Sequence, residues 1–138
     1  MAGQLIEQAV GIGVDVVDVG DFERVSLQRS PGFYKRCFSE SEIAYCSAQA
    51  RPAQHFAARF AAKEAAVKAL ATHSQLAYWQ IEVERGPDGQ PDLALWTYDR
   101  SAPLAEMQGL DLKVSLSHAD VWAAAMVVAF SKDPTRAE

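Results

Sequence analysis

The chain has 138 residues, 49% of them hydrophobic, which is enough for a single domain, residues 1–138, with a buried core. Its net charge of −5 argues against nucleic-acid binding, because phosphate contacts need a basic face. No apolar run approaches the roughly 18 residues of a membrane span, and the first ten residues lack the pattern of a secretory signal. We therefore expect a cytoplasmic protein without membrane segments, in which Cys37 and Cys46 are free, reduced thiols.

The β-branched run Val10–Val19 predicts a strand that carries an acidic residue, Asp15. Asp15 shares its face of this strand with Gly11 and Gly13. Because these glycines lack side chains, a second backbone or a ligand can approach the strand closely beside the carboxylate. A buried carboxylate usually has a partner, so Asp15 either pairs with an arginine such as Arg59 for structural reasons or binds a functional cation.

Two helices are expected before the middle of the chain. The first is capped by Asp18 or Asp21 and ends at Pro31 and the glycine after it. The second follows a short segment within residues 33–47, where Ser39 and Glu42 have the spacing of a capping box.

A long Ala-rich helix is predicted from about Ala53 to Ala71, and it carries the second acidic residue of interest, Glu64. At 100° per residue, Glu64 falls on the stripe of this helix that should be buried. The other members of the stripe are Ala57, Phe60, Ala61, Val67 and Ala71. An ionised carboxylate there needs compensation, either from Lys68 one turn away or from a divalent cation.

The C-terminal half predicts mostly strands. Turn formers between residues 86 and 91 indicate a hairpin, and a weak helix should end at Gly109. The expected elements are strand Trp79–Glu84, strand Asp92–Tyr98, helix Ser101–Gln108, strand Leu112–Ser117, strand Val121–Phe130 and a frayed tail. Ser115, Ser117 and His118 are read as a polar strand face running into a turn, and without a GxSxG elbow acyl-enzyme chemistry is not expected.

Four blocks resemble, in order, those of the holo-acyl-carrier-protein synthases, the short 4′-phosphopantetheinyl transferases. The blocks are GIGVDVVDVGDFERV, RFAAKEAAVKAL, QIEVERGPDGQP and KVSLSHADVWAAAMVV. The most specific elements are the G-x-D strand, the K-E-A helix about fifty residues later and the S-x-S-H segment near the end. The resemblance implies an α+β 4′-phosphopantetheinyl transferase fold, with a small antiparallel sheet packed around one long Ala-rich helix.

The resemblance also implies an activity. Asp15 and Glu64 would bind Mg²⁺, which prefers oxygen ligands and would also hold the diphosphate of coenzyme A. A serine of apo acyl carrier protein would receive 4′-phosphopantetheine, and adenosine 3′,5′-bisphosphate would leave. The alternative is a degenerate homologue that binds carrier protein or coenzyme A without turnover. The proton of the attacking serine would pass to Glu64 or to a metal-bound water, and the sequence leaves both open.

Further residue roles follow from the same resemblance. Lys68 would contact the coenzyme A phosphates and stabilise the leaving group, while Arg59, Ser117 and His118 would contact the nucleotide. Lys63 projects about 100° away from Glu64 and would serve solvent, a subunit contact or the nucleotide.

Two partner surfaces are implied as well. An acidic carrier protein needs a local basic patch on this acidic chain, and Arg24 is the best docking residue, with Arg29 beside it. The short members of the family generally form homotrimers with active sites at subunit interfaces, so we expect that assembly here.

Overall fold

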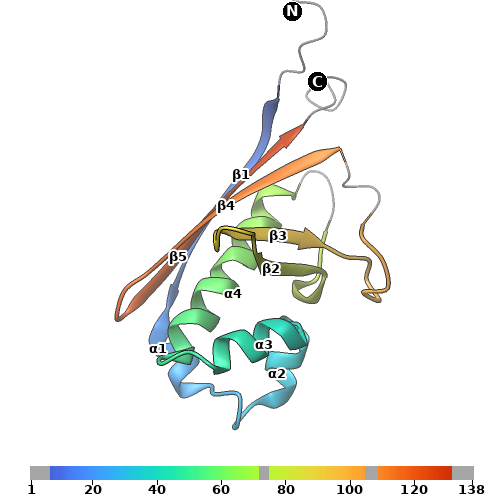
Figure 1. Ribbon diagram of the computed structural model, residues 1–138. Helices are drawn as coiled ribbons and strands as arrows, with labels where there is room; N and C mark the ends of the chain where they lie inside the picture. The colour runs from blue at the N-terminus through green and yellow to red at the C-terminus, as the bar shows by residue number, and fades with distance from the viewer. Residues whose placement is uncertain (1–6, 72–74, 105–108, 132–138) are drawn as a thin grey trace, which may run out of the picture.

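The protein folds around a three-stranded antiparallel sheet with one long helix against it. The computed structural model describes residues 7–71, 75–104 and 109–131. Strands β1 (Gln8–Asp18), β5 (Trp122–Ser131) and β4 (Leu110–His118) lie in the order β1-β5-β4. Strands β2 (Ile81–Arg85) and β3 (Pro91–Leu95) form a separate antiparallel hairpin, which crosses in front of the long helix in Figure 1.

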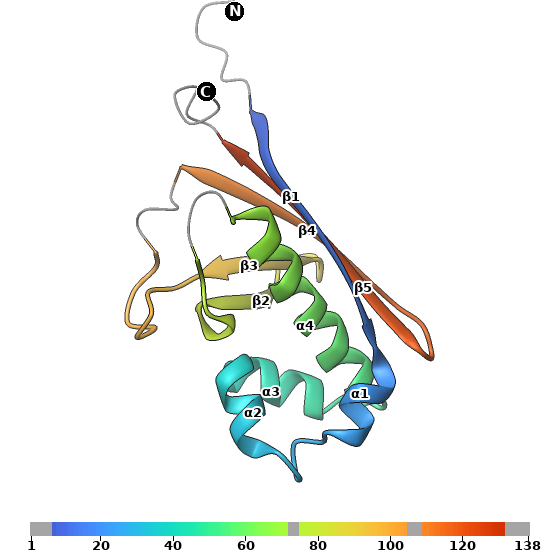
Figure 2. The same cartoon turned by 180° about the vertical axis from the view of Figure 1, so that it is seen from behind.

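Helix α4 (Pro52–Ala69) runs along one face of this sheet in both views (Figures 1 and 2). The close approach depends on the two glycines of β1. A Cβ atom at Gly11 would overlap the carbonyl oxygen of Ala69, and one at Gly13 would overlap that of Ala65. The expectation that another backbone approaches the strand beside Asp15 is therefore confirmed, and that backbone is α4.

Three short helices lie at the end of the sheet where β1 ends, in Figure 2. They are α1 (Val19–Arg24), α2 (Pro31–Cys37) and α3 (Glu40–Ser47). The capping box is confirmed, because the Ser39 hydroxyl accepts from Glu42 N at 3.2 Å and the Glu42 carboxylate accepts from Ser39 N at 2.9 Å. The prediction that Pro31 ends the first helix is wrong. Pro31 begins α2, where its missing N–H costs nothing.

The later strands are confirmed with small shifts, and two local predictions fail. Residues Tyr78–Gln80 form a 3₁₀ turn, η1, so the strand expected from Trp79 begins at Ile81. The helix expected at 101–108 is wrong for 101–104, because Pro103 pairs with Trp96 in an isolated β-bridge, and residues 105–108 lie outside the described residues. The tail, 132–138, also lies outside them.

The core has two parts on the α4 side of the sheet. One joins the alanines of α4 to β2, β4 and β5, and the other gathers aromatic side chains at the helical end. Cys37 and Cys46 are free thiols buried in this second part, as predicted. Within the described ranges, no helix is both long and apolar enough to cross a membrane.

Candidate active site

The two acidic residues singled out from the sequence line one cavity. Asp15 comes from the middle of β1 and Glu64 from the fourth turn of α4, and both border a hollow of about 630 Å³. Two further carboxylates, Asp18 and Asp21, line the same space. Its apolar wall is formed by Val17, Phe22, Val25, Phe33 and Phe60. The fold thus concentrates negative charge in one cavity that has a mostly apolar wall.

Lys68 belongs to this carboxylate cavity through Asp15 rather than through Glu64. Its Nζ lies 3.3 Å from the Asp15 carboxylate and 3.0 Å from the carbonyl oxygen of Val14. The Lys68 side chain is 53% exposed, whereas that of Asp15 is 19% exposed. The expected Glu64–Lys68 ion pair and the alternative Asp15–Arg59 pair are both replaced by this contact, because α4 packs directly on β1.

Glu64 has a different partner, Tyr78 of η1, whose hydroxyl donates to Oε1 of Glu64. This hydrogen bond, together with burial and the negative charges of Glu64 and Asp15, raises the pKa of Tyr78 to about 12. Tyr78 was missed at the sequence level. A lone tyrosine before a strand carries no periodic signal, and the fold alone brings it to the fourth turn of α4.

The donor set of the carboxylate cavity suits a hard divalent cation. Carboxylate oxygens are the ligands that Mg²⁺ prefers, and Mg²⁺ usually takes only one or two carboxylates from a protein. Across residues 7–71, 75–104 and 109–131 no group of three metal-binding side chains occurs. An ion held by Asp15 and Glu64 would therefore complete its coordination with oxygens of water or substrate. Such an ion would supply charge neutralisation for a phosphoryl transfer.

A second hollow, of about 230 Å³, has a mostly basic set of charged side chains: it brings together Arg59 and His118, and Glu84 is an acidic residue that lines it. His55 and Arg85, which the sequence analysis missed, line it too. The signal for His55 was its position one turn before Arg59 on the same helix. This basic hollow suits a phosphate group.

Arg59 is built into the wall of the basic hollow. The residue is only 6% exposed, and its guanidinium carbon lies 4.3 Å from the centre of the Tyr45 ring. Its Nε is buried and has no hydrogen-bond partner within the described part of the chain. Burial, together with the positive charges of His118, Arg59 and Arg85, lowers the pKa of His55. The hollow thus has donors and positive charge that an anion would satisfy.

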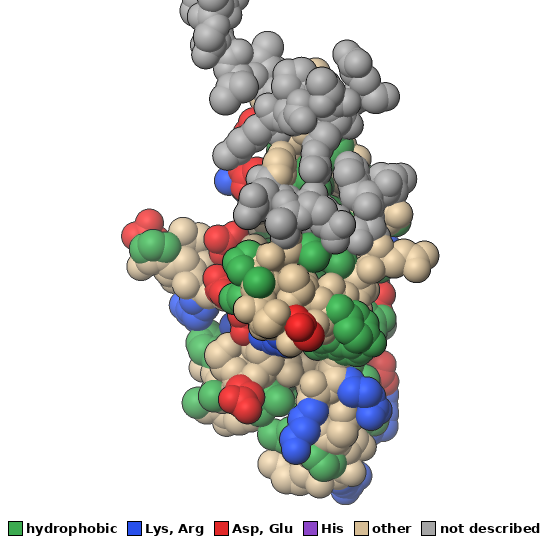
Figure 3. All heavy atoms as spheres, turned by 90° about the vertical axis from the view of Figure 1, so that its right-hand side faces the viewer, with side chains coloured by type: hydrophobic (Ala, Val, Ile, Leu, Met, Phe, Trp, Pro, Cys, Tyr) green, Lys and Arg blue, Asp and Glu red, His purple; other side chains and the backbone are tan. Residues whose placement is uncertain are grey.

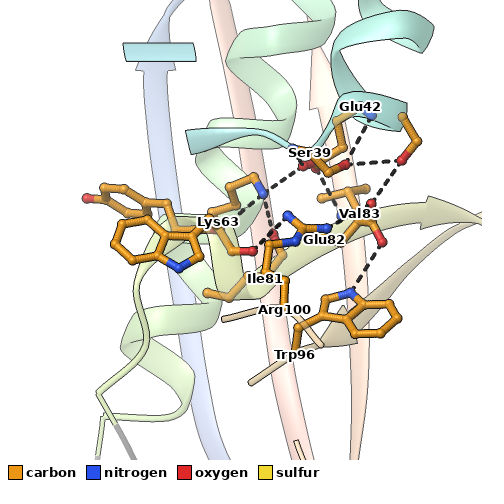
Figure 4. Close-up of polar contacts among 11 residues, drawn as sticks. Ser39, Glu42, Lys63, Ile81, Glu82, Val83, Trp96 and Arg100 are labelled. Carbon is orange, nitrogen blue, oxygen red and sulfur yellow. Dashed lines mark hydrogen bonds and ion pairs between the residues drawn. The ribbon is translucent and has the colours of Figure 1, made fainter. Parts of the chain in front are cut away.

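The expectation that Lys63 serves solvent, a subunit contact or the nucleotide is wrong. Its side chain is 0% exposed, and its Nζ lies 2.9 Å from Oε1 of Glu42, which is equally buried. Figure 4 shows Lys63 reaching between α3 and β2, where it also donates to the carbonyl oxygen of Ile81. Helix periodicity gave the direction of Lys63, but α3 and β2 cover that direction.

The remaining predicted residues lie on two other surfaces. Ser117 alternates with Leu116 and His118 on β4, so it points to the opposite face of the sheet from the basic hollow. Arg24 and Arg29 are exposed at the helical end, over which Lys and Arg side chains gather in Figure 3. Arg24 pairs at 2.5 Å with Asp21, which lines the carboxylate cavity. Arg24 therefore lies next to that cavity.

Comparison with known proteins identifies the family of this chain. Residues 11–126 match the family model of the 4′-phosphopantetheinyl transferase superfamily, and this span includes both hollows. The chain belongs to this superfamily. Among curated transferase relatives, it is 42% identical to the holo-[acyl-carrier-protein] synthase of Geobacter metallireducens, over 86% of this chain and 94% of the relative. The resemblance read from the four sequence blocks is confirmed.

Solved transferases share the fold as well. The holo-[acyl-carrier-protein] synthase of Neisseria meningitidis aligns with a TM-score of 0.74 at 26% identity, covering 88% of this chain and 98% of that one. The Helicobacter pylori synthase, solved in complex with coenzyme A, aligns with a TM-score of 0.68 at 29% identity, covering 86% and 98%. The predicted α+β phosphopantetheinyl transferase fold is confirmed.

Proposed function

We propose that this chain transfers 4′-phosphopantetheine from coenzyme A to a serine of apo acyl carrier protein, releasing adenosine 3′,5′-bisphosphate. The observation that carries the proposal is the convergence of Asp15 and Glu64, from two separate elements, on one cavity beside Lys68. Relatives named holo-[acyl-carrier-protein] synthase support the reaction, and the coenzyme A complex of the Helicobacter pylori protein supports the donor.

In this proposal Asp15 and Glu64 would hold Mg²⁺, which would supply charge neutralisation for the diphosphate of coenzyme A. Lys68 places its ammonium 3.3 Å from Asp15, so it can add a second positive charge for the departing phosphate. Glu64 or a metal-bound water would accept the proton of the carrier-protein serine. Oε1 of Glu64 already accepts a hydrogen bond from Tyr78. Alignment and charge neutralisation supply most of the catalysis.

The basic hollow would bind the phosphorylated nucleoside end of coenzyme A. Arg59 and His118 line it, as the resemblance implied, and His55 and Arg85 add two further cationic or donor groups. Arg59 and Glu64 lie five residues apart on α4, about 7.5 Å along the helix axis. The two side chains project about 140° apart around the helix, and the hollows lie against opposite edge strands, β1 and β4. A coenzyme A molecule that filled both kinds of hollow would therefore have to bridge two subunits. Ser117 points away from the basic hollow of its own chain. It would therefore contact only a nucleotide that is bound on the other face of the sheet, for example one held by a neighbouring subunit.

The carrier protein would dock at the helical end. Arg24 and Arg29 are exposed there, with Lys35 and Arg36 on α2 close in sequence. An acidic partner bound to this patch would present its serine to the carboxylate cavity, because Asp21 joins the patch to the cavity through Arg24.

A homotrimer is the proposed assembly. The exposed apolar side chains on the face of the sheet that is turned away from α4 support it. Three apolar side chains of β1 are more than half exposed, Ile12, Val14 and Val16, and Met126 of β5, opposite Val14, is 43% exposed. A contiguous apolar patch of this kind is typical of a protein interface. Light scattering should give a trimer for the wild type and smaller species for Val14→Lys. A monomeric wild type would exclude the trimer. The cytoplasmic location stays a prediction.

Mass spectrometry of apo acyl carrier protein tests the reaction. With coenzyme A and Mg²⁺, the carrier should gain the mass of one 4′-phosphopantetheine group, and chelation of the metal should abolish the gain. Asp15→Asn and Glu64→Gln should lose turnover and keep their fold, while Asp88→Asn, in the exposed turn of the β2–β3 hairpin, should act as wild type. Binding of coenzyme A without any mass gain would identify a degenerate homologue.

A further inference from the structure

Two neighbouring residues of α4, Lys63 and Glu64, both contact Tyr78, one at its backbone carbonyl and the other at its hydroxyl. Lys63 Nζ donates to the backbone carbonyl of Tyr78 at 3.2 Å, and Glu64 accepts from the Tyr78 hydroxyl. Consecutive helix residues project about 100° apart, so one of them can reach the core and the other the carboxylate cavity. Tyr78 therefore lies between the buried interior and the site proposed to bind the metal.

The core end of this arrangement is rigid. Lys63 and Glu42 are both 0% exposed and lie 2.9 Å apart, and the other carboxylate oxygen of Glu42 accepts from Val83 N at 3.0 Å. Figure 4 shows this set of contacts, which ties α3, α4 and β2 together. The turn that carries Tyr78 is closed by the hydrogen bond from Gln80 N to Ala77 O at 3.0 Å.

The cavity end is restricted by packing. The Tyr78 ring lies 5.2 Å, centre to centre, from that of Phe60, and Phe60 is part of the apolar wall of the carboxylate cavity. With its backbone held by Lys63 and its ring against Phe60, Tyr78 has little freedom to move its hydroxyl away from Glu64.

We propose that Tyr78 is a positioning residue for Glu64. Its hydroxyl uses one lone pair of Oε1 and so fixes the carboxylate plane, leaving the other lone pairs for a metal ion, while the Lys63–Glu42 pair holds Tyr78 in place. Hydrogen bonds that orient a ligating carboxylate are typically worth 10–100-fold in metal affinity or activity. The inference rests on the proposed function, because it assumes that Glu64 binds a metal.

The test compares Tyr78→Phe with Tyr98→Phe. The first variant removes only the hydroxyl and keeps the ring against Phe60, whereas Tyr98 is 68% exposed and contacts Trp79, next to Tyr78 in the turn. Mn²⁺ binding to each protein with coenzyme A present is followed by the electron paramagnetic resonance of free Mn²⁺. Steady-state rates are measured against Mg²⁺, coenzyme A and carrier protein.

Tyr78→Phe is expected to bind Mn²⁺ about 10–100-fold more weakly and to need correspondingly more Mg²⁺ for half its maximal rate, with KM for carrier protein unchanged. Tyr98→Phe should match the wild type in each measurement. If the wild type binds Mn²⁺ and Tyr78→Phe binds it with the same affinity, the positioning role is overturned and the proposed function stays intact. A wild type that neither binds Mn²⁺ nor transfers the group would instead overturn the proposed function and this inference with it.

Discussion

Replacement of Lys63 by methionine should destabilise the protein strongly, although no part of Lys63 reaches the surface. The ammonium donates to Oε1 of Glu42 at 2.9 Å and to the carbonyls of Tyr78 and Ile81. Burial lowers the pKa of Lys63, and the Glu42 carboxylate with its hydrogen bond acts in the opposite direction. Because methionine fills a volume similar to that of lysine, the loss of stability would come from the missing charge and its hydrogen bonds rather than from a cavity.

The magnitude follows from what the substitution leaves behind. Glu42 keeps two backbone donors, Ser39 N at 2.9 Å and Val83 N at 3.0 Å, but loses the cation that balances its charge. Breaking a buried pair in this way costs about 3–5 kcal/mol. That is a large fraction of the ~5–15 kcal/mol that stabilises a typical domain. The melting temperature should fall by roughly 10–20 °C for a chain of this size.

Urea unfolding followed by circular dichroism measures this loss, and two further variants make the test specific. Lys35→Met, at an exposed position of α2, should change the free energy of unfolding by less than about 0.5 kcal/mol. Glu42→Gln combined with Lys63→Met should be less destabilised than the sum of the single variants, because the uncompensated charge is gone. If Lys63→Met cost less than about 1 kcal/mol, or if the costs of the two substitutions simply added, then loss of Lys63 would not leave an uncompensated buried charge on Glu42.

Three further predictions concern other parts of the fold. Gly13→Ala should lower the free energy of unfolding in urea by at least about 2 kcal/mol, because its Cβ would overlap the carbonyl oxygen of Ala65. Gly32→Ala, at an exposed position, should cost little, and equal costs for the two variants would exclude close packing of α4 on β1. Burial lowers the pKa of His55 below the usual histidine value of about 6.5, and an anion in the basic hollow should raise it again. Affinity for adenosine 3′,5′-bisphosphate, measured by calorimetry, should therefore rise as pH falls below about 6.5, and rise less steeply in His55→Asn, which keeps His118 in the hollow. A flat wild-type profile would argue against binding there. Burial raises the pKa of Cys46 to about 12, so the unfolded chain loses this proton first and stability should decline as pH rises above about 9; Cys46→Ala should flatten that decline in urea midpoints, and an unchanged slope would show that another group causes it.

The sequence predicted those features that depend on local patterns. The Ala-rich helix, the strands of the main sheet, and the capping box of Ser39 and Glu42 all follow from periodicity or short spacing, and the structure confirms them. The placement of Asp15 and Glu64 on one cavity was also predicted, but only through the resemblance to a known family. Spacing along the chain cannot bring a strand and a helix together.

Partners fixed by tertiary packing were not predictable. Lys68 was one of two candidate partners for Glu64, beside a divalent cation. In the structure Lys68 contacts Asp15 of β1, and Glu64 accepts a hydrogen bond from Tyr78. Lys63 shows the same limit, because a helical projection says in which direction a side chain points but not whether α3 will cover it. Pro31 was read as a stop signal, although proline is equally common at the first position of a helix.

Anomalous diffraction from a crystal grown with Mn²⁺ and coenzyme A would locate the metal ion without any assay of turnover. We expect one peak that contacts carboxylate oxygens of both Asp15 and Glu64 and an oxygen of the coenzyme A diphosphate. A peak elsewhere, or a diphosphate bound away from these two side chains, would contradict this expectation.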